Sequence, residues 1–272
     1  MEGHIISMNI DRKLSSLIQL SEITTQHHPA IVCIQDMYNE NTEDKQEAMN
    51  RLFPGYIQQT AGQPRARLKT LTCTQRTVNL HTNSYCDENI ITILITRSKI
   101  ADSQIINTAN IYIRPKSSAL AVIKALDWIE QNVQHISQTL LVGDFNAISH
   151  IWDNEYANRL IMKALTPYDK KKIEKGKIIE NWMGKKNLMC LNEDTRAPTY
   201  SAEDGHTSTI DLAIVGSKTR RKWSELRVLD MTRVGHKPLL ITSVGQNKMM
   251  TTRKVKYLPN KQLIRESDIE TI

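Results

Sequence analysis

Residues 138–152, QTLLVGDFNAISHIW, contain a short apolar run that is followed at once by a carboxylate and an amide. The run at 140–142 predicts a buried strand, and Gly143 permits the chain to turn at its end. Asp144 and Asn146 are two residues apart, so in an extended chain their side chains leave the same face. Held together at the edge of a sheet where a strand ends, this pair can bind a water, a metal or a phosphate. A turn with local side-chain hydrogen bonds is the alternative for this motif taken alone.

Two further strand ends near the start of the chain carry polar side chains. Residues 4–8 and 30–34 are short apolar runs, and the helical period between them predicts a strand–helix–strand unit. Asp11 is in position to cap the helix. Asn9 and Asp36 lie at the carboxyl ends of the two strands. Because ligands bind at that edge in open α/β sheets, both residues are candidates for a binding site.

The remaining pattern predicts one α/β domain over residues 1–245. Strands are expected at 90–95, 105–112, 209–215 and 238–244, and helices at 118–133 and over most of 155–187. The last helix contains a lysine run at 170–177, which predicts a solvated helix face, with contact to a phosphate backbone as the alternative. Residues 246–272 are basic and poor in apolar residues, so a linker or a disordered tail is expected there.

Composition limits the partners and the setting of the protein. The 272 residues carry a formal net charge of +7 with a pI of about 9.2, a surplus that favours polyanionic partners. The four cysteines, Cys33, Cys73, Cys86 and Cys190, show no zinc-ligand spacing, which is typical of reduced intracellular thiols. The sequence shows neither a membrane-spanning apolar run nor a secretory signal, and we therefore expect a soluble intracellular protein.

A second polar constellation lies near the end of the predicted domain. Asp211 falls inside the apolar run TIDLAIV, where burying a carboxylate is costly unless a charged or hydrogen-bonding partner compensates. His236, just before the last predicted strand, is the natural partner, because an aspartate that fixes a histidine tautomer prepares a catalytic imidazole. A loop-capping Asp211 with a surface His236 is the alternative when the two are considered alone.

The order of these residues, with the sequences around them, resembles the endonuclease/exonuclease/phosphatase superfamily. The matching strings are MNI, CIQD, NIYIRP, GDFNA, STIDLAIVGS and GHKPLLI, which extend from residue 8 to residue 241. Endonuclease domains of non-LTR retrotransposons are more similar still, because Trp152 follows GDFNA and LMCLNEDTRAPTY corresponds to a segment of that group. PRARL and SYCDENIITILI look like its jockey/R-element side. The resemblance implies a four-layer α/β sandwich, in which two packed mixed β-sheets are flanked by helices.

The resemblance also implies a metal-dependent phosphodiesterase site with a role for each matched position. Asp144 would orient or deprotonate the attacking water, and Asn146 would help to position it. Asp211 would orient His236, which would stabilise the pentavalent phosphate. Tyr112 would contact the scissile phosphate. Bound Mg²⁺, or Mn²⁺ in its place, would neutralise charge on the phosphate and on the leaving oxygen.

Two positions depart from the family pattern on the metal side of the implied site. Asn9, in the same part of the site, does match the family and would hydrogen-bond a carboxylate or the phosphate. Asp36 stands where the family has a metal-binding glutamate and is one methylene shorter. Gly235 replaces the aspartate that precedes the family's histidine, so it brings no side chain to the metal. These changes predict weak metal affinity and impaired catalysis.

Three functions follow from the resemblance and the charge. The first is Mg²⁺-dependent nicking of double-stranded DNA for target-primed reverse transcription, with a reverse transcriptase domain that normally lies downstream and is absent from these 272 residues. The second is a catalytically inactive DNA-binding remnant of the same fold, for which residues 220–222 add a basic run. A same-fold phosphatase of lipid or inositol phosphates, or an abasic-site nuclease, ranks lower. A DNA substrate implies a nuclear location.

Overall fold

The computed structural model describes residues 3–37, 43–61, 69–75, 80–87, 91–100, 104–133, 135–156, 165–230 and 234–243. The first half of the chain contains β1 His4–Asn9, α1 Leu14–His27, β2 Ile31–Met37, α2 Glu43–Leu52, β3 Tyr56–Ala61, β4 Lys69–Gln75, β5 Leu80–Asp87, β6 Ile91–Ile100, β7 Gln104–Ile113 and α3 Ala119–Asn132. The second half contains η1 Ile136–Gln138, β8 Thr139–Asp144, α5 Pro167–Lys186, β9 Leu188–Cys190, α6 Asn192–Thr195, β10 Tyr200–Ser201, β11 Thr207–Ser208, β12 Asp211–Gly216, η2 Ser217–Lys222, β13 Trp223–Val228, β14 Gly235–His236 and β15 Leu239–Ser243.

The strands form two large mixed sheets. The first has the order β13-β15-β1-β2-β4-β3, with β1 and β2 parallel, and the second has the order β5-β6-β7-β8-β12-β9, with β7 and β8 parallel. The other strand pairs described in these two sheets are antiparallel. A parallel pair needs a crossover connection, and α1 and α3 lie in these two connections. β10 lies between β11 and β14 in a small third sheet.

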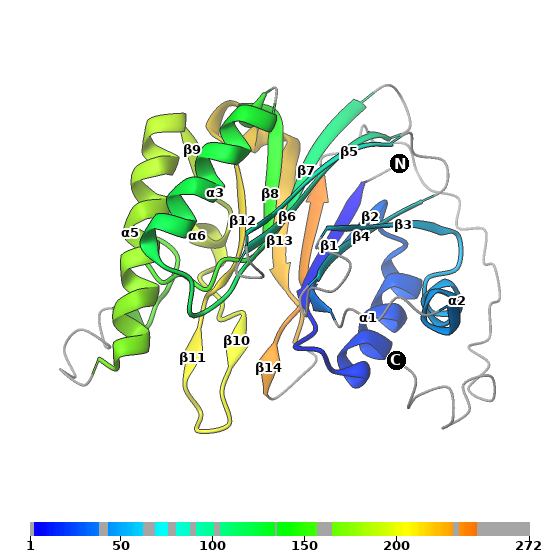
Figure 1. Cartoon of the computed structure of the whole chain (residues 1–272), viewed down its shortest axis with the longest axis horizontal. Helices are drawn as coiled ribbons and strands as arrows, with labels where there is room; N and C mark the ends of the chain where they lie inside the picture. Colours follow the sequence, from blue (N-terminus) through cyan, green and yellow to red (C-terminus); the bar gives the residue numbers. More distant parts are fainter. Residues whose placement is uncertain are drawn as a thin grey trace.

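Helices cover the outer faces of the two large sheets, which pack against each other face to face (Figure 1). The apolar layer between the sheets draws on β1, β2 and β15 from one sheet and on β8 and β12 from the other, with Cys33 and Val142 both fully buried. α3 and α5 pack on the second sheet through residues such as Ile129 and Trp182, whereas α1 packs on the first through Leu17. The predicted four-layer α/β sandwich is therefore confirmed.

A buried polar contact joins the two sheets. Asn110 in β7 donates from Nδ2 to the backbone carbonyl of Leu71 in β4 at 2.9 Å, and its Oδ1 accepts from Gln35 Nε2 at 2.7 Å. Asn110 and Gln35 are both fully buried. An unpaired polar group in such an interior would cost about 1–3 kcal/mol, so this contact favours one alignment of the sheets over others.

Most of the predicted elements are confirmed, with boundaries shifted by a few residues. The helix predicted over most of 155–187 is observed as α5 from Pro167 to Lys186, and residues 157–164 lie outside the described part of the chain. Asp11 does not cap α1, because its backbone is left-handed with a φ of 47°; the N-cap is Lys13, and its side chain makes no capping hydrogen bond. Residues 246–272 and the domain boundary predicted at 245 lie outside the described part of the chain. Within that part, we find no helix with the length and apolar character that a membrane crossing requires.

Candidate active site

The register of the second sheet brings three of the predicted site residues into one row. Tyr112 near the end of β7 lies beside Asp144 at the end of β8, in parallel register. Asp211, the first residue of β12, lies on the other side of Asp144 in antiparallel register. Neighbours across adjacent strands point to the same face of a sheet. The hydroxyl and the two carboxylates therefore share one face at this edge.

The first sheet adds Asn9 and Asp36, which lie at or near the ends of β1 and β2. Asn9 Nδ2 donates to Asp144 Oδ2 at 2.8 Å, and its Oδ1 accepts from the backbone N–H of Asp11 at 2.8 Å. The second bond fixes which end of the amide faces Asp144. Asp36 is also buried. The burial of Tyr112 raises the pKa of its hydroxyl, and the charges of Asp144 and Asp36 raise it further.

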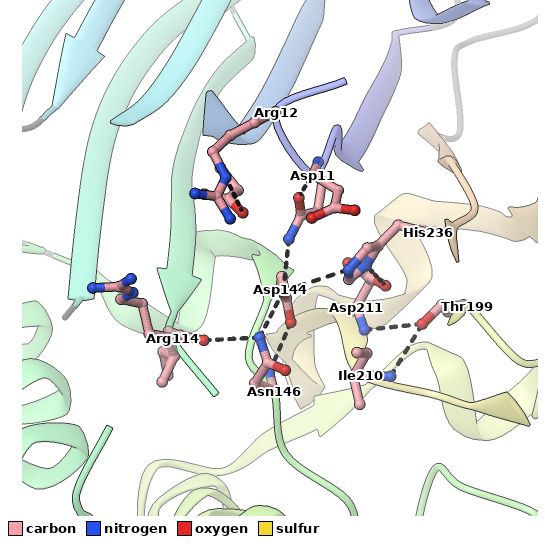
Figure 2. A network of polar contacts seen from close by, with 12 residues as sticks. Asp11, Arg12, Arg114, Asp144, Asn146, Thr199, Ile210, Asp211 and His236 are labelled. Atoms are coloured by element: carbon pink, nitrogen blue, oxygen red, sulfur yellow. Dashed lines mark hydrogen bonds and ion pairs between the residues drawn. The ribbon is translucent and has the colours of Figure 1, made fainter. Parts of the chain in front are cut away.

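Asp144 is held by the amide two residues further along the chain (Figure 2). Asn146 donates from its backbone N–H to Oδ1 at 2.8 Å and from Nδ2 to Oδ2 at 2.7 Å, and Nδ2 also donates to the Ile113 carbonyl at 3.0 Å. The extended chain expected from the two-residue spacing is wrong, because Asn146 is left-handed with a φ of 45°, which folds its amide back onto the carboxylate. Gly143 is required before this turn, since a Cβ there would overlap the Ile111 carbonyl.

His236 approaches the same carboxylate from β14 (Figure 2). Its Nδ1 lies 2.9 and 3.0 Å from the two carboxylate oxygens of Asp211, and its Nε2 lies 4.0 Å from Asp144 Oδ2. β14 pairs with β10, which sets the Tyr200 ring edge-on to the imidazole with 4.9 Å between ring centroids. The imidazole is thus fixed between one aspartate that orients it and a second that it faces, which is an arrangement suited to acid–base chemistry.

Two residues that were not predicted as site residues hold the backbone around Asp211. Thr199 Oγ1 accepts from the N–H groups of Ile210 and Asp211 at 3.0 and 2.9 Å. Asn192 Nδ2 donates to the Asp211 carbonyl at 3.0 Å, and its Oδ1 accepts from the Ala213 N–H at 2.9 Å. Both belong to LMCLNEDTRAPTY, one of the segments that carried the family resemblance. The sequence therefore marked this segment as part of the family pattern, but it did not indicate that these two side chains hold the backbone around Asp211.

The combined effect of burial and neighbouring charges raises the pKa values of both Asp144 and His236 above their ordinary values. Burial, together with the neighbouring charge of Asp211, raises the pKa of Asp144 to about 7, although His236 opposes the shift. Burial acts to lower the pKa of His236, but the adjacent Asp211, with a contribution from Asp144, raises it to about 9. Between these values the site presents a carboxylate base beside a protonated imidazole.

The Asp36 side of the site fits a single divalent cation. Asp36 is buried, and its Oδ1 accepts no hydrogen bond of ordinary geometry from the described residues. Such an oxygen suits Mg²⁺, which binds one or two carboxylates and completes its shell with phosphate and water. Gly235 adds no ligand, and its φ of 104° is one that side-chain-bearing residues rarely adopt, although a Cβ there would meet nothing within 4 Å. Asp144, Asp211 and His236 also lie close together, but the last two are already bonded to each other.

The lysine run on α5 contains one residue that is not solvated, so the prediction of an exposed face is wrong at this position. Lys175 is buried, and its Nζ donates to the carbonyls of Arg114 and Pro115 at 3.3 and 3.2 Å. This contact ties α5 to the turn after β7, next to the Ile113 carbonyl that receives Asn146 Nδ2. Lys175 is therefore an anchor of the structure that supports the site.

The basic run at residues 220–222 lies away from the predicted catalytic residues. It belongs to η2, which follows the end of β12 that is opposite to Asp211. The five residue steps from Asp211 to Gly216, at about 3.3 Å each, separate the two ends by about 17 Å. Arg220 also pairs with Asp194. The run is therefore not beside the phosphate that the site would hold.

Comparison with known proteins agrees with the fold. The family model described as "Endonuclease-reverse transcriptase" matches residues 106–233. The endonuclease domain of TRAS1, a telomere-specific non-LTR retrotransposon, is 17% identical with a TM-score of 0.66, over 89% of this chain and 98% of that one. The AP endonuclease LMAP from Leishmania major is 16% identical with a TM-score of 0.66, over 90% and 88%. An AP endonuclease from Archaeoglobus fulgidus is 15% identical with a TM-score of 0.65, over 89% and 99%. No curated protein sequence matches the chain.

Two packed mixed sheets with their flanking helices are the fold of the endonuclease/exonuclease/phosphatase superfamily. Within that superfamily, residues 106–233 match the endonuclease-reverse transcriptase family. The resemblance drawn from the sequence, to the endonuclease domains of non-LTR retrotransposons, is therefore confirmed.

Proposed function

We propose that the chain is a divalent-metal-dependent DNA endonuclease of a non-LTR retrotransposon, which hydrolyses a phosphodiester bond in one strand and leaves a 3′-hydroxyl primer. The observation that carries the proposal is the convergence of three side chains on one oxygen of Asp144, to which Asn146 Nδ2 donates at 2.7 Å. His236 Nε2 lies 4.0 Å from Oδ2, and Asn9 Nδ2 lies 2.8 Å from the same atom. A fixed carboxylate beside a protonated imidazole can activate a water and stabilise the charge that its attack creates.

Asp144 is the proposed general base. Its pKa of about 7 leaves it largely ionised in mildly alkaline solution, where it can accept a proton from water. Asn9 and Asn146 donate to its oxygens and hold the plane of the carboxylate. The attacking water would therefore meet an acceptor of fixed orientation, which lowers the entropic cost of reaching the transition state.

His236 and Tyr112 are proposed to stabilise the charge that develops on the phosphate. Below its pKa of about 9 the imidazole is protonated, so Nε2 can donate to a phosphate oxygen while Nδ1 donates to Asp211. The raised pKa of Tyr112 keeps its hydroxyl protonated and able to donate to the same group. Preorganised donors of this kind contribute about 10²–10³ in rate each.

Asp36 is the residue proposed to hold Mg²⁺, or Mn²⁺ in its place, because its buried Oδ1 accepts no hydrogen bond of ordinary geometry from the described residues. The cation would supply electrostatic stabilisation of charge on the phosphate and on the leaving oxygen. The net charge of +7 supports duplex DNA as the polyanionic substrate. At the start of α5, Tyr168 is 41% exposed and Lys172 Nζ lies 5.3 Å from its ring centroid. This aromatic and basic pair is available to contact DNA.

Nicking of supercoiled plasmid by the purified protein, in Mg²⁺ and separately in Mn²⁺, tests the proposal. Asp144→Asn and His236→Ala should each reduce nicking by about 10²-fold or more. Asp204 and His206 form an exposed acid–imidazole pair 3.9 Å apart, so Asp204→Asn and His206→Ala are matched controls that should leave nicking unchanged. Absence of nicking by the wild type in both metals would contradict the proposal, as would full activity in Asp144→Asn.

A catalytically inactive DNA-binding protein of the same fold is the second candidate. It is favoured by Gly235, which leaves this position next to His236 without a carboxylate. This candidate predicts no nicking together with duplex binding that weakens steeply between about 50 and 200 mM salt, since bound protein releases counterions from the phosphates. Filter binding over that range measures it, and tight binding that ignores salt would count against it.

The choice of duplex separates the proposal from a repair activity. Two of the similar structures are AP endonucleases, so a duplex with one abasic site is the informative comparison. Cleavage of intact and abasic duplexes at equal rates would favour the retrotransposon activity, whereas cleavage of the abasic duplex alone would favour repair. A reverse transcriptase domain as partner and a nuclear location belong to the same proposal, since the cut end would prime synthesis on chromosomal DNA.

A further inference from the structure

The loop between β1 and α1 carries Arg12 (Figure 2). This arginine lies against the buried Asp36. Arg12 Nε lies 3.6 Å from Asp36 Oδ2, and the Arg12 backbone N–H donates to the Asp36 carbonyl at 3.0 Å. The Ile10 N–H donates to the Gln35 carbonyl at 3.1 Å, so the loop is bonded to β2 through its backbone as well. Asp11, Arg12 and Asp36 all have left-handed φ angles, of 47°, 54° and 50°. The approach of guanidinium to carboxylate is thus built into the backbone of both segments.

The Arg12 guanidinium is a cation that Asp36 already has before any metal binds. The two charges lie 3.6 Å apart at a carboxylate that is buried, so water screens their attraction only weakly. Arginine stays charged throughout the pH range in which proteins are folded, so this cation cannot leave by losing a proton. The Arg12 side chain is 39% exposed, which leaves it room to swing away from Asp36. A divalent cation at Asp36 would therefore compete with a permanent charge.

We propose that Arg12 is a built-in competitor for the metal: its guanidinium lies against Asp36 Oδ2 in the free protein and opposes the binding of a divalent cation to Oδ1 of the same carboxylate. Its relevance to strand nicking rests on the proposed function. An arginine beside an aspartate changes the proton affinity of that aspartate by about 10- to 1000-fold. A divalent metal ion carries twice the charge of a proton, so the guanidinium opposes its binding more strongly. The competition is a property of this chain's own side chains, and it acts in the same direction as the short Asp36 side chain and the missing carboxylate at Gly235.

Titration of the DNA-free protein with Mn²⁺, followed by the electron paramagnetic resonance signal of free Mn²⁺, tests this inference. Arg12→Gln should tighten the Kd for Mn²⁺ about tenfold or more, whereas Arg12→Lys, which keeps the charge, should bind Mn²⁺ as weakly as the wild type. Adding Asp36→Asn to Arg12→Gln should abolish the gain. Arg51→Gln removes an exposed arginine that pairs with Glu47 on α2, so it is the matched control and should leave the Kd unchanged.

Two outcomes would overturn the inference: a Kd in Arg12→Gln within about twofold of the wild-type value, or a gain that survives Asp36→Asn. Arg12→Gly is a second charge-removing variant that suits the left-handed backbone at this position, so it must show the same tightening if Arg12→Gln folds poorly. The titration contains no DNA. Failure of the wild type to nick would defeat the endonuclease proposal without altering these Kd values, and unchanged Kd values would defeat the inference without altering the nicking assay.

Discussion

Replacing Asp211 by asparagine keeps the size of the side chain but removes the negative charge that faces His236. Asp211 lies 2.9 Å from Nδ1, and the pKa of His236 is about 9 rather than the ordinary 6.5. Each pKa unit corresponds to about 1.4 kcal/mol, so the site favours the imidazolium over neutral imidazole by about 3 kcal/mol relative to water. Burial acts in the other direction, and Asp211 is the largest influence that overcomes it.

We therefore expect Asp211→Asn to lower the pKa of His236 to 6.5 or below, which leaves the imidazole neutral in mildly alkaline solution. Titration of the histidine ring protons by NMR measures this change directly. Nicking should fall by about 10²–10⁴-fold, because the charged donor to the phosphate is lost. Asp204→Asn removes the exposed carboxylate beside His206 and should leave the titration of His236 unchanged. A His236 that still titrates above about pH 8 in Asp211→Asn would refute the electrostatic reasoning.

Nicking should follow a bell-shaped pH profile, rising as Asp144 loses its proton with a pKa of about 7 and falling as His236 loses its proton with a pKa of about 9; a flat profile from about pH 6 to 10 would contradict these roles. Asn110→Leu should lower the free energy of unfolding by about 3 kcal/mol, because its buried partners lose their hydrogen bonds; urea unfolding measures this, and a loss below about 1 kcal/mol would show that the contact between the sheets is dispensable. Gly176→Ala should destabilise the protein by about 1–3 kcal/mol, because a Cβ there overlaps backbone packed against α5. Gly184→Ala lies on an open part of the same helix and should instead raise Tm. Equal shifts in Tm for the two variants would argue against this docking of α5.

The site could be anticipated from the sequence wherever a polar residue interrupts or ends an apolar run. Asp144 follows such a run and Asp211 interrupts another, and a carboxylate in a buried strand stands out because burial without a partner is costly. Arg12 and Lys175 could not be anticipated in the same way. A charge pattern does not say which residue of a helix meets two carbonyl groups, so Lys175 looked like its solvated neighbours. The left-handed φ of Arg12 depends on contacts with β2 that no local pattern encodes.

By itself, the sequence determined the alternation of strands and helices, and with it an α/β domain, because apolar periodicity and turn chemistry act over a few neighbouring residues. The four-layer arrangement was implied only by the family resemblance. The sequence also determined which polar residues come at strand ends. Only the tertiary structure decided how those residues meet. Asn9 and Asp144 are 135 positions apart and belong to different sheets, so their 2.8 Å contact depends on how the sheets pack and on the register of each strand. The pKa values of Asp144 and His236 arise from the same long-range arrangement, because burial and neighbouring charge exist only once the chain has folded.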